Sequence, residues 1–163
     1  MEIERKFLIN SLPDNVLSSC ECAEIEQSYL DFGDGEEPER RIRKTVQNGE
    51  AKYFYTEKGK GNLSREEEEY EISEYSYNGL SDLVISPIIH KKRYYFSLSD
   101  TLIAEIDVYL GELDGLITVE IEFPDLQIAQ EFKAPDWFGD EVTYDKRYKN
   151  KNLAISISNK QSK

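Results

Sequence analysis

Apolar and polar residues alternate with a period of two along most of this chain, and such alternation is typical of β-strands. At the start of the chain, Glu2, Glu4 and Lys6 share one face, while Ile3 and Phe7 share the other. The pattern predicts eight strands, at about residues 2–9, 24–32, 39–47, 51–58, 65–73, 88–98, 102–110 and 116–123. The chain is therefore predicted to be mainly β.

Three short helices are expected beside these strands, because apolar residues recur there at helical spacing or follow a capping residue. They lie near residues 12–17, 76–85 and 125–133. Eight mostly antiparallel strands are too many for a small open sheet and suit closure into a barrel. We therefore predict a mainly β (α+β) fold, a closed eight-stranded antiparallel β-barrel tunnel with a few helices packed outside.

The length of 163 residues suits one domain. Residues 1–158 are predicted to form it, with an irregular segment from Pro135 towards Asn152, and residues 159–163 are predicted to be a frayed tail. No apolar run approaches the roughly 20 residues that a membrane span needs, and no signal peptide precedes Glu2. These features predict a cytoplasmic protein without a membrane partner.

The charged faces of the predicted strands carry acids or bases in pairs. Arg41 and Arg43 lie two residues apart on one strand, and Glu120 and Glu122 do so on another. The opposite faces are apolar and suit burial under the three helices, so the charged faces would line the tunnel. The bases expected there are Lys6, Arg41, Arg43, Lys52, Lys58, Arg65, Lys91 and Arg93. The acids expected there are Glu2, Glu4, Glu67, Glu69, Glu71, Glu105, Asp107, Glu120 and Glu122, and Glu39 at a strand entrance would add one more.

This predicted lining is nearly neutral, whereas the whole chain carries a net charge of −13. Burying so many ions without water would cost several kcal/mol for each ion. The total cost would exceed the roughly 5–15 kcal/mol of stability that a domain has. The tunnel must therefore be wet, loaded with metal ions or occupied by a polyanion. Carboxylates favour Mg²⁺ or Mn²⁺, and rows of Arg and Lys suit triphosphate oxygens.

The rest of the composition argues against other kinds of site. An excess of Asp and Glu, 33 against 20 Lys and Arg, disfavours nucleic-acid partners. Cys20 and Cys22 are the only cysteines, and His90 is the only histidine. A zinc site needs more such ligands, and a catalytic triad is built around a histidine.

The opening Glu2-Ile3-Glu4-Arg5-Lys6 resembles the ExExK signature of the CYTH superfamily, the triphosphate tunnel metalloenzymes. Further motifs of this family follow in order over nearly the whole chain. They are Gln27-Ser28-Tyr29-Leu30, Arg41-Ile42-Arg43, Thr56-Glu57-Lys58-Gly59, Arg65 with Glu69-Tyr70-Glu71-Ile72, Lys91-Lys92-Arg93-Tyr94, Glu105-Ile106-Asp107, Val119-Glu120-Ile121-Glu122 and Pro135-Asp136-Trp137-Phe138-Gly139. Glu57 departs from the family, which usually has an apolar residue there.

The resemblance implies a role for each matching residue. The metal ligands would be Glu2, Glu4, Glu69, Glu71, Asp107, Glu120 and Glu122. The substrate-binding bases would be Lys6, Arg41, Arg43, Lys58, Arg65, Lys91 and Arg93. In short bacterial members, a tyrosine at the position of Tyr29 and a lysine at that of Lys91 act together in catalysis. Tyr29 would take a proton from the attacking water if Lys91 lowered its pKa, and the alternative is that Tyr29 only packs or hydrogen-bonds at the tunnel wall.

The function expected from these features is a metal-dependent hydrolase that cleaves inorganic tripolyphosphate to pyrophosphate and phosphate, with Mg²⁺ or Mn²⁺ as cofactor. A class IV-type adenylate cyclase or a thiamine triphosphatase is the alternative, since both need the same phosphate and metal sites. A noncatalytic polyphosphate-binding protein is a third. The partner is in each case a small polyanion, tripolyphosphate or a nucleoside or thiamine triphosphate, and the oligomeric state stays open.

Overall fold

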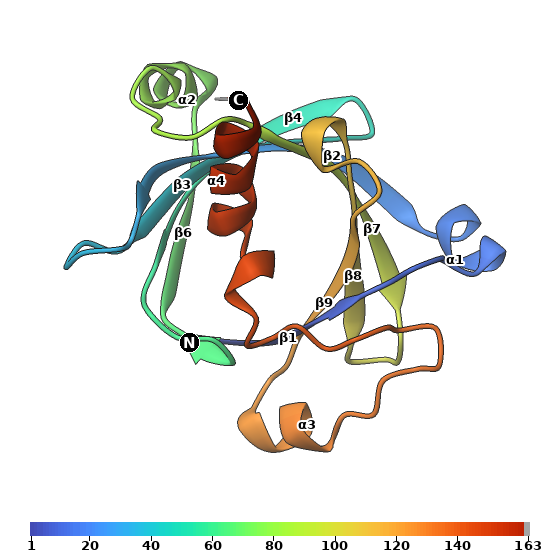
Figure 1. Cartoon of the computed structure of the whole chain (residues 1–163). Coiled ribbons are helices and arrows are strands. Elements are labelled where there is room, and N and C mark those ends of the chain that lie inside the picture. The colour runs from blue at the N-terminus through green and yellow to red at the C-terminus, as the bar shows by residue number, and fades with distance from the viewer. Residues whose placement is uncertain (162–163) are drawn as a thin grey trace.

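The computed structural model describes residues 1–161 and contains one strongly curved antiparallel sheet (Figure 1). Its nine strands follow the order β5-β1-β9-β8-β7-β2-β3-β4-β6. They are β1 (Glu2–Leu8), β2 (Glu21–Phe32), β3 (Glu39–Gln47), β4 (Glu50–Lys58), β5 (Ser64–Arg65), β6 (Glu67–Ile72), β7 (Ile89–Ser97), β8 (Ile103–Tyr109) and β9 (Ile117–Glu122). The helices are α1 (Asp14–Ser18), α2 (Glu74–Ser81), α3 (Leu126–Glu131) and α4 (Asn150–Gln161), with 3₁₀ turns η1 (Gly111–Leu113) and η2 (Lys146–Tyr148).

The two outermost strands of the sheet, β5 and β6, are consecutive in the chain and separated by Glu66. Strand β5 pairs with β1, with Arg65 opposite Glu2, and β6 pairs with β4, with Glu67 opposite Lys58. One extended segment therefore links both ends of the sheet and makes it a nearly closed barrel. The single strand predicted at about residues 65–73 is thus two strands, β5 and β6, in the structure. This difference explains why the sheet has nine strands and not the predicted eight.

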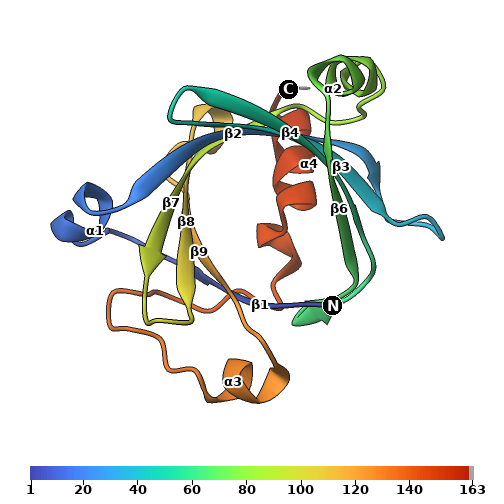
Figure 2. The same cartoon turned by 180° about the vertical axis from the view of Figure 1, so that it is seen from behind.

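The core of the protein lies on the outer surface of the barrel, as the alternation predicts. Ile3 and Phe7 of β1 pack with Ile106 and Ile121 and with Ala129 of α3. Helices α1 and α3 and the segment 132–138 lie outside the ring of strands (Figures 1 and 2). Because alternate side chains point in opposite directions, the charged residues of the same strands face the interior.

Helix α4 lies across the opening of the ring in both views (Figures 1 and 2). Its Leu153, Ala154 and Ile157 join a second apolar cluster that contains Tyr29 of β2 and Tyr109 of β8. This helix was not predicted from the sequence, although its apolar residues recur at a helical spacing. It continues through residues 159–161, which were predicted to be frayed, and residues 162–163 lie outside the described part of the chain.

Between residues 1 and 161, no helix combines the length and the apolar character that crossing a membrane requires.

Candidate active site

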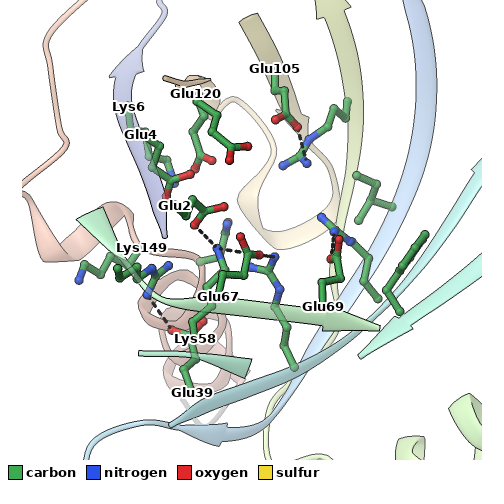
Figure 3. A pocket seen from close by; sticks show the side chains of 18 of the residues that line it. Glu2, Glu4, Lys6, Glu39, Lys58, Glu67, Glu69, Glu105, Glu120 and Lys149 are labelled. Atoms are coloured by element: carbon green, nitrogen blue, oxygen red, sulfur yellow. Dashed lines mark hydrogen bonds and ion pairs between the residues drawn. The ribbon is translucent and has the colours of Figure 1, made fainter. Parts of the chain in front are cut away.

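The barrel encloses a charged cavity of about 530 Å³ (Figure 3). Strands on all sides of the ring contribute to its walls, and the η2–α4 junction contributes Tyr148, Lys149 and Asn150. Most of the predicted site residues line it. These are Glu2, Glu4, Lys6, Tyr29, Arg41, Arg43, Lys58, Arg65, Glu69, Arg93, Glu120 and Glu122.

Three predicted site residues lie elsewhere. The side chains of Lys91 and Asp107 are 0% and 2% exposed, form an ion pair of 2.8 Å and do not line the cavity. Arg93 donates two hydrogen bonds to the same Asp107 carboxylate. Both oxygens of Asp107 are thus engaged by cations, which leaves it unlike a metal ligand. Glu71 shares the parity of Glu69 but is exposed and does not line the cavity.

Acids and bases from different strands pair along the cavity wall. Lys6 lies 3.2 Å from Glu120, and Arg43 lies 2.6 Å from Glu69. The remaining pairs are Lys58 with Glu2 and Glu67, Arg41 with Glu67, Arg65 with Glu39, and Arg93 with Glu105. This cross-strand pairing explains how the barrel tolerates so many ionised groups in its interior, since each charge is partly compensated.

The arginines of β3 retain unused hydrogen-bonding capacity. The Nε atoms of Arg41 and Arg43 are buried, and neither donates to an acceptor within residues 1–161. An unsatisfied buried donor costs free energy, about 1–3 kcal/mol, so a ligand that accepts from it is stabilised. Phosphate oxygens are strong acceptors that arginine engages with paired N–H groups. The cavity is therefore suited to a polyanion.

Glu4 has no basic partner among the described residues, in contrast to its neighbours. Burial, and then the negative charge of Glu120, raise the pKa of Glu4 to about 8. Glu122 lies opposite Glu4 in the register of β1 and β9, and burial followed by the charges of Glu2 and Glu105 raises its pKa. Lys6 and Arg93 outweigh the effect of burial on Glu120 and lower its pKa to about 2. Carboxylates without compensating charge thus gather where β1 meets β9.

This group fits a divalent cation of the magnesium type. Within residues 1–161, no three acids, histidines or cysteines form a ready-made metal cage. Mg²⁺ rarely uses such a cage, because it keeps waters and is held by one or two carboxylates together with substrate phosphates. Glu4 and Glu122, with Glu2 beside them, would supply those carboxylates, and the added positive charge would offset their repulsion.

We expect metal binding to release a proton near neutral pH. With a pKa of about 8, the Glu4 carboxyl is mostly protonated at pH 7 and must ionise to bind a cation. Affinity for Mg²⁺ or Mn²⁺ should therefore rise from pH 6 to pH 8 and level off above it. Calorimetric titration in buffers of different ionisation enthalpy measures this proton. Release of no proton at pH 7, or the same release from a Glu4→Gln variant, would contradict the assignment.

Tyr29 and Lys91 are not joined by a hydrogen bond or ion pair. Gln27 donates to the Tyr29 hydroxyl at 2.9 Å, whereas Lys91 lies over the ring of Tyr109. Burial, and then the charge of Glu39, raise the pKa of Tyr29 above its ordinary value. The expectation that Lys91 lowers this pKa is wrong, because Tyr29 lies in an apolar cluster beside an acid. Burial instead lowers the pKa of Lys91 to about 7, although Asp107 opposes the shift.

Glu39, expected at a strand entrance, lines the cavity, whereas Lys149 was not predicted to do so. Glu39, which is 6% exposed, faces inwards from β3 with the same parity as Arg41, so the strand pattern contained the signal. Lys149 comes from the segment predicted to be irregular, and no periodicity marks it. Its position follows from the path of the chain between η2 and α4.

Comparison with known proteins agrees with this geometry. The model of the CYTH domain family matches residues 1–155. An inorganic triphosphatase of Nitrosomonas europaea is 40% identical over 156 residues, 96% of this chain and 98% of that protein. An inorganic triphosphatase of Acetivibrio thermocellus is 38% identical over 154 residues, 93% and 92% of the two chains.

Solved structures show the same fold. The crystal structure of the inorganic triphosphatase NE1496 has a TM-score of 0.67 and is 38% identical, with 96% of each chain covered. The PH1819 protein of Pyrococcus horikoshii, at 19% identity, has a TM-score of 0.64 over 98% of this chain and 99% of its own, and shares the fold. The family match spans nearly the whole barrel and includes every strand that lines the cavity. This chain belongs to the CYTH domain family.

Proposed function

We propose that this chain is a divalent-metal-dependent triphosphatase, which hydrolyses inorganic tripolyphosphate to pyrophosphate and phosphate. The unused Nε donors of Arg41 and Arg43 in the charged cavity carry the proposal. The relatives described as inorganic triphosphatases support the choice of substrate. Mg²⁺ or Mn²⁺ is the proposed cofactor, held by Glu4 and Glu122 with Glu2 beside them.

The proposed reaction is attack of water on a terminal phosphorus without a covalent enzyme intermediate. Phosphoryl transfer needs mainly alignment and neutralisation of charge, and the bases of the cavity provide both. Arg41 and Arg43 bind phosphate oxygens from β3, while Lys58 and Arg65 reach them from the adjoining wall. When bound, the metal ion supplies further positive charge to the phosphate oxygens.

We assign Tyr29 the role of hydrogen-bond donor to the attacking water or to a phosphate oxygen. Its raised pKa keeps the hydroxyl protonated at neutral pH, which does not suit the proton acceptor that the sequence suggested. Lys91, with a pKa of about 7, is the member of the pair that can take up a proton there. Because Lys91 does not line the cavity, the proton would reach it through neighbouring groups.

Tyr29→Phe removes only the hydroxyl and should lower the rate at saturating tripolyphosphate by about 10- to 100-fold, the value of one hydrogen bond to a charged group. KM should change little, because the ring still packs under α4. Steady-state kinetics measures both quantities. The variant Tyr75→Phe, on an exposed tyrosine of α2, is the matched control. Near-normal turnover in Tyr29→Phe would remove this hydroxyl from the mechanism.

The choice of substrate is tested by a panel of tripolyphosphate, ATP and thiamine triphosphate with each metal. Preferential release of phosphate from tripolyphosphate is expected. Formation of cyclic AMP from ATP would favour the adenylate cyclase alternative. Preferential hydrolysis of thiamine triphosphate would favour a thiamine triphosphatase. Tight binding of all three without turnover would indicate a polyphosphate-binding protein. The cytoplasmic location and the single domain over residues 1–158 stay predictions from the sequence.

A further inference from the structure

A second cavity of about 330 Å³ adjoins the first, between the start of α4 and the loops that follow β2 and β4. Six bases line it: Lys58, Lys60, Arg65, Lys146, Lys149 and Lys151. Against them stand two acids, Asp34 and Glu39. Glu39 is paired with Arg65, and Asp34, whose side chain is 74% exposed, lies 3.5 Å from Lys151. In a chain with a net charge of −13, this concentration of positive charge is a local exception.

The two cavities share a wall. Lys58, Arg65 and Lys149 line both, together with Glu39 and Gly61. Figure 3 shows Lys58, Lys149 and Glu39 grouped at one end of the tunnel, away from Glu105. A chain of phosphates in the tunnel would therefore point one end towards the second cavity.

Three of the bases are held in place by backbone carbonyls. Lys60 donates to Gly35 O at 2.9 Å, Lys149 to Gly61 O at 3.1 Å, and Lys151 to Phe32 O at 3.0 Å. Each ammonium has three donors, so further N–H groups are left for a ligand. These contacts tie the two loops to each other, to Lys149 and to the start of α4, and they fix the position of the cations before any anion binds.

The backbone of the loop after β4 also helps to fix the position of Lys149. Gly61 has φ +143°, and a Cβ there would lie 2.1 Å from Ser64 O. A larger residue would therefore shift the backbone of Gly61, whose own carbonyl accepts the hydrogen bond from Lys149.

The positive charges of the second cavity repel one another. Burial, and then Arg65 and Lys151, lower the pKa of Lys149. An anion among these cations would relieve that repulsion.

We infer that this second cavity is an anion site that binds a tetrahedral phosphate group next to the tunnel. The group is either free orthophosphate or the terminal phosphate of a polyphosphate longer than three units, whose other phosphates occupy the tunnel. Both present the same oxygens to the same lysines. The polyphosphate source rests on the proposed function, whereas binding of orthophosphate does not.

The test uses Lys60, Lys146 and Lys151, which line the second cavity but not the tunnel. A combined Lys60→Gln, Lys146→Gln and Lys151→Gln variant is compared with wild type and with a control of equal charge change, Lys44→Gln, Lys92→Gln and Lys133→Gln. The control lysines line neither cavity. Lys146→Gln alone is added, because its side chain makes no hydrogen bond or ion pair within residues 1–161, so its loss leaves the loop contacts intact.

The first measurement is calorimetric titration with inorganic phosphate at pH 7 without metal. The second is kcat/KM for tripolyphosphate and for tetrapolyphosphate. We expect the triple variant to keep its kcat/KM for tripolyphosphate. A tenfold or greater loss of orthophosphate affinity identifies free phosphate, and a tenfold loss of kcat/KM for tetrapolyphosphate alone identifies the chain end. Lys146→Gln should show a smaller loss in the same measurement.

Unchanged values in both measurements, or an equal loss in the control variant, would overturn the inference. If wild type hydrolyses no polyphosphate, the proposed function fails while the phosphate titration still decides the nature of this cavity.

Discussion

Replacing Glu4 by glutamine should lower triphosphatase activity by about 10³-fold while the fold is kept. The substitution preserves the shape of the side chain and removes a carboxylate that faces the cavity without a basic partner in the described chain. A cation that neutralises the phosphates loses one of the few ligands it has, which costs several kcal/mol in a shielded site. Steady-state phosphate release over a range of metal concentrations measures the loss.

The control is Glu24→Gln, on an exposed glutamate of β2 that lines neither cavity. It should retain normal activity. Thermal unfolding distinguishes loss of function from loss of structure, because Glu4→Gln replaces a carboxyl that is mostly protonated at pH 7 with a neutral group of the same shape and should not lower Tm. Activity of Glu4→Gln within a factor of three of wild type would show that this carboxylate does not hold the metal.

Arg41→Ala and Arg43→Ala should each weaken binding of a nonhydrolysable triphosphate analogue by about 10²- to 10³-fold. Both guanidinium groups are inside the cavity and have a buried Nε that no acceptor of residues 1–161 engages. Truncating a buried, charge-assisted contact costs about 2–5 kcal/mol, partly because the anion is left unpaired. Calorimetric titration with the analogue in the presence of metal gives the two affinities.

The two substitutions should affect the acidic partners of Arg41 and Arg43 differently. Arg43→Ala leaves Glu69 without its partner at 2.6 Å, whereas Arg41 lies 3.8 Å from Glu67, which Lys58 also contacts. Arg40→Ala, one residue away on the opposite face of β3, is the control. Unchanged affinity in both tunnel variants would place the triphosphate elsewhere.

Much of the barrel follows from the period of two alone. Once Ile3 and Phe7 are assigned to a buried face, the parity of β1 sends Glu2, Glu4 and Lys6 to the other, and the structure places all three on the cavity wall. The same parity places Arg41, Arg43, Glu120 and Glu122. A barrel has one interior, so correct parity on each strand is enough to bring these residues together.

The parity of a residue on its strand does not predict how deeply its side chain is buried, and it does not predict which segments cover the ends of the barrel. Lys91 and Asp107 have the predicted parity, yet they are buried and do not line the cavity, because a salt bridge between β7 and β8 satisfies both groups there. Glu71 is beyond the region that the cavity reaches. The raised pKa of Tyr29 depends on α4 and on Glu39, and neither its burial under a distant helix nor this neighbour can be read from strand alternation.

The central claim, that the acidic rows of the tunnel serve a metal ion and the basic rows a triphosphate, is tested by one measurement. Purified protein is incubated with tripolyphosphate and Mg²⁺ or Mn²⁺, with and without excess chelator, and phosphate and pyrophosphate are quantified. The predicted result is release of both products in equal amounts with metal and none with chelator. Absence of hydrolysis with either metal, or hydrolysis that continues undiminished in chelator, would contradict the claim.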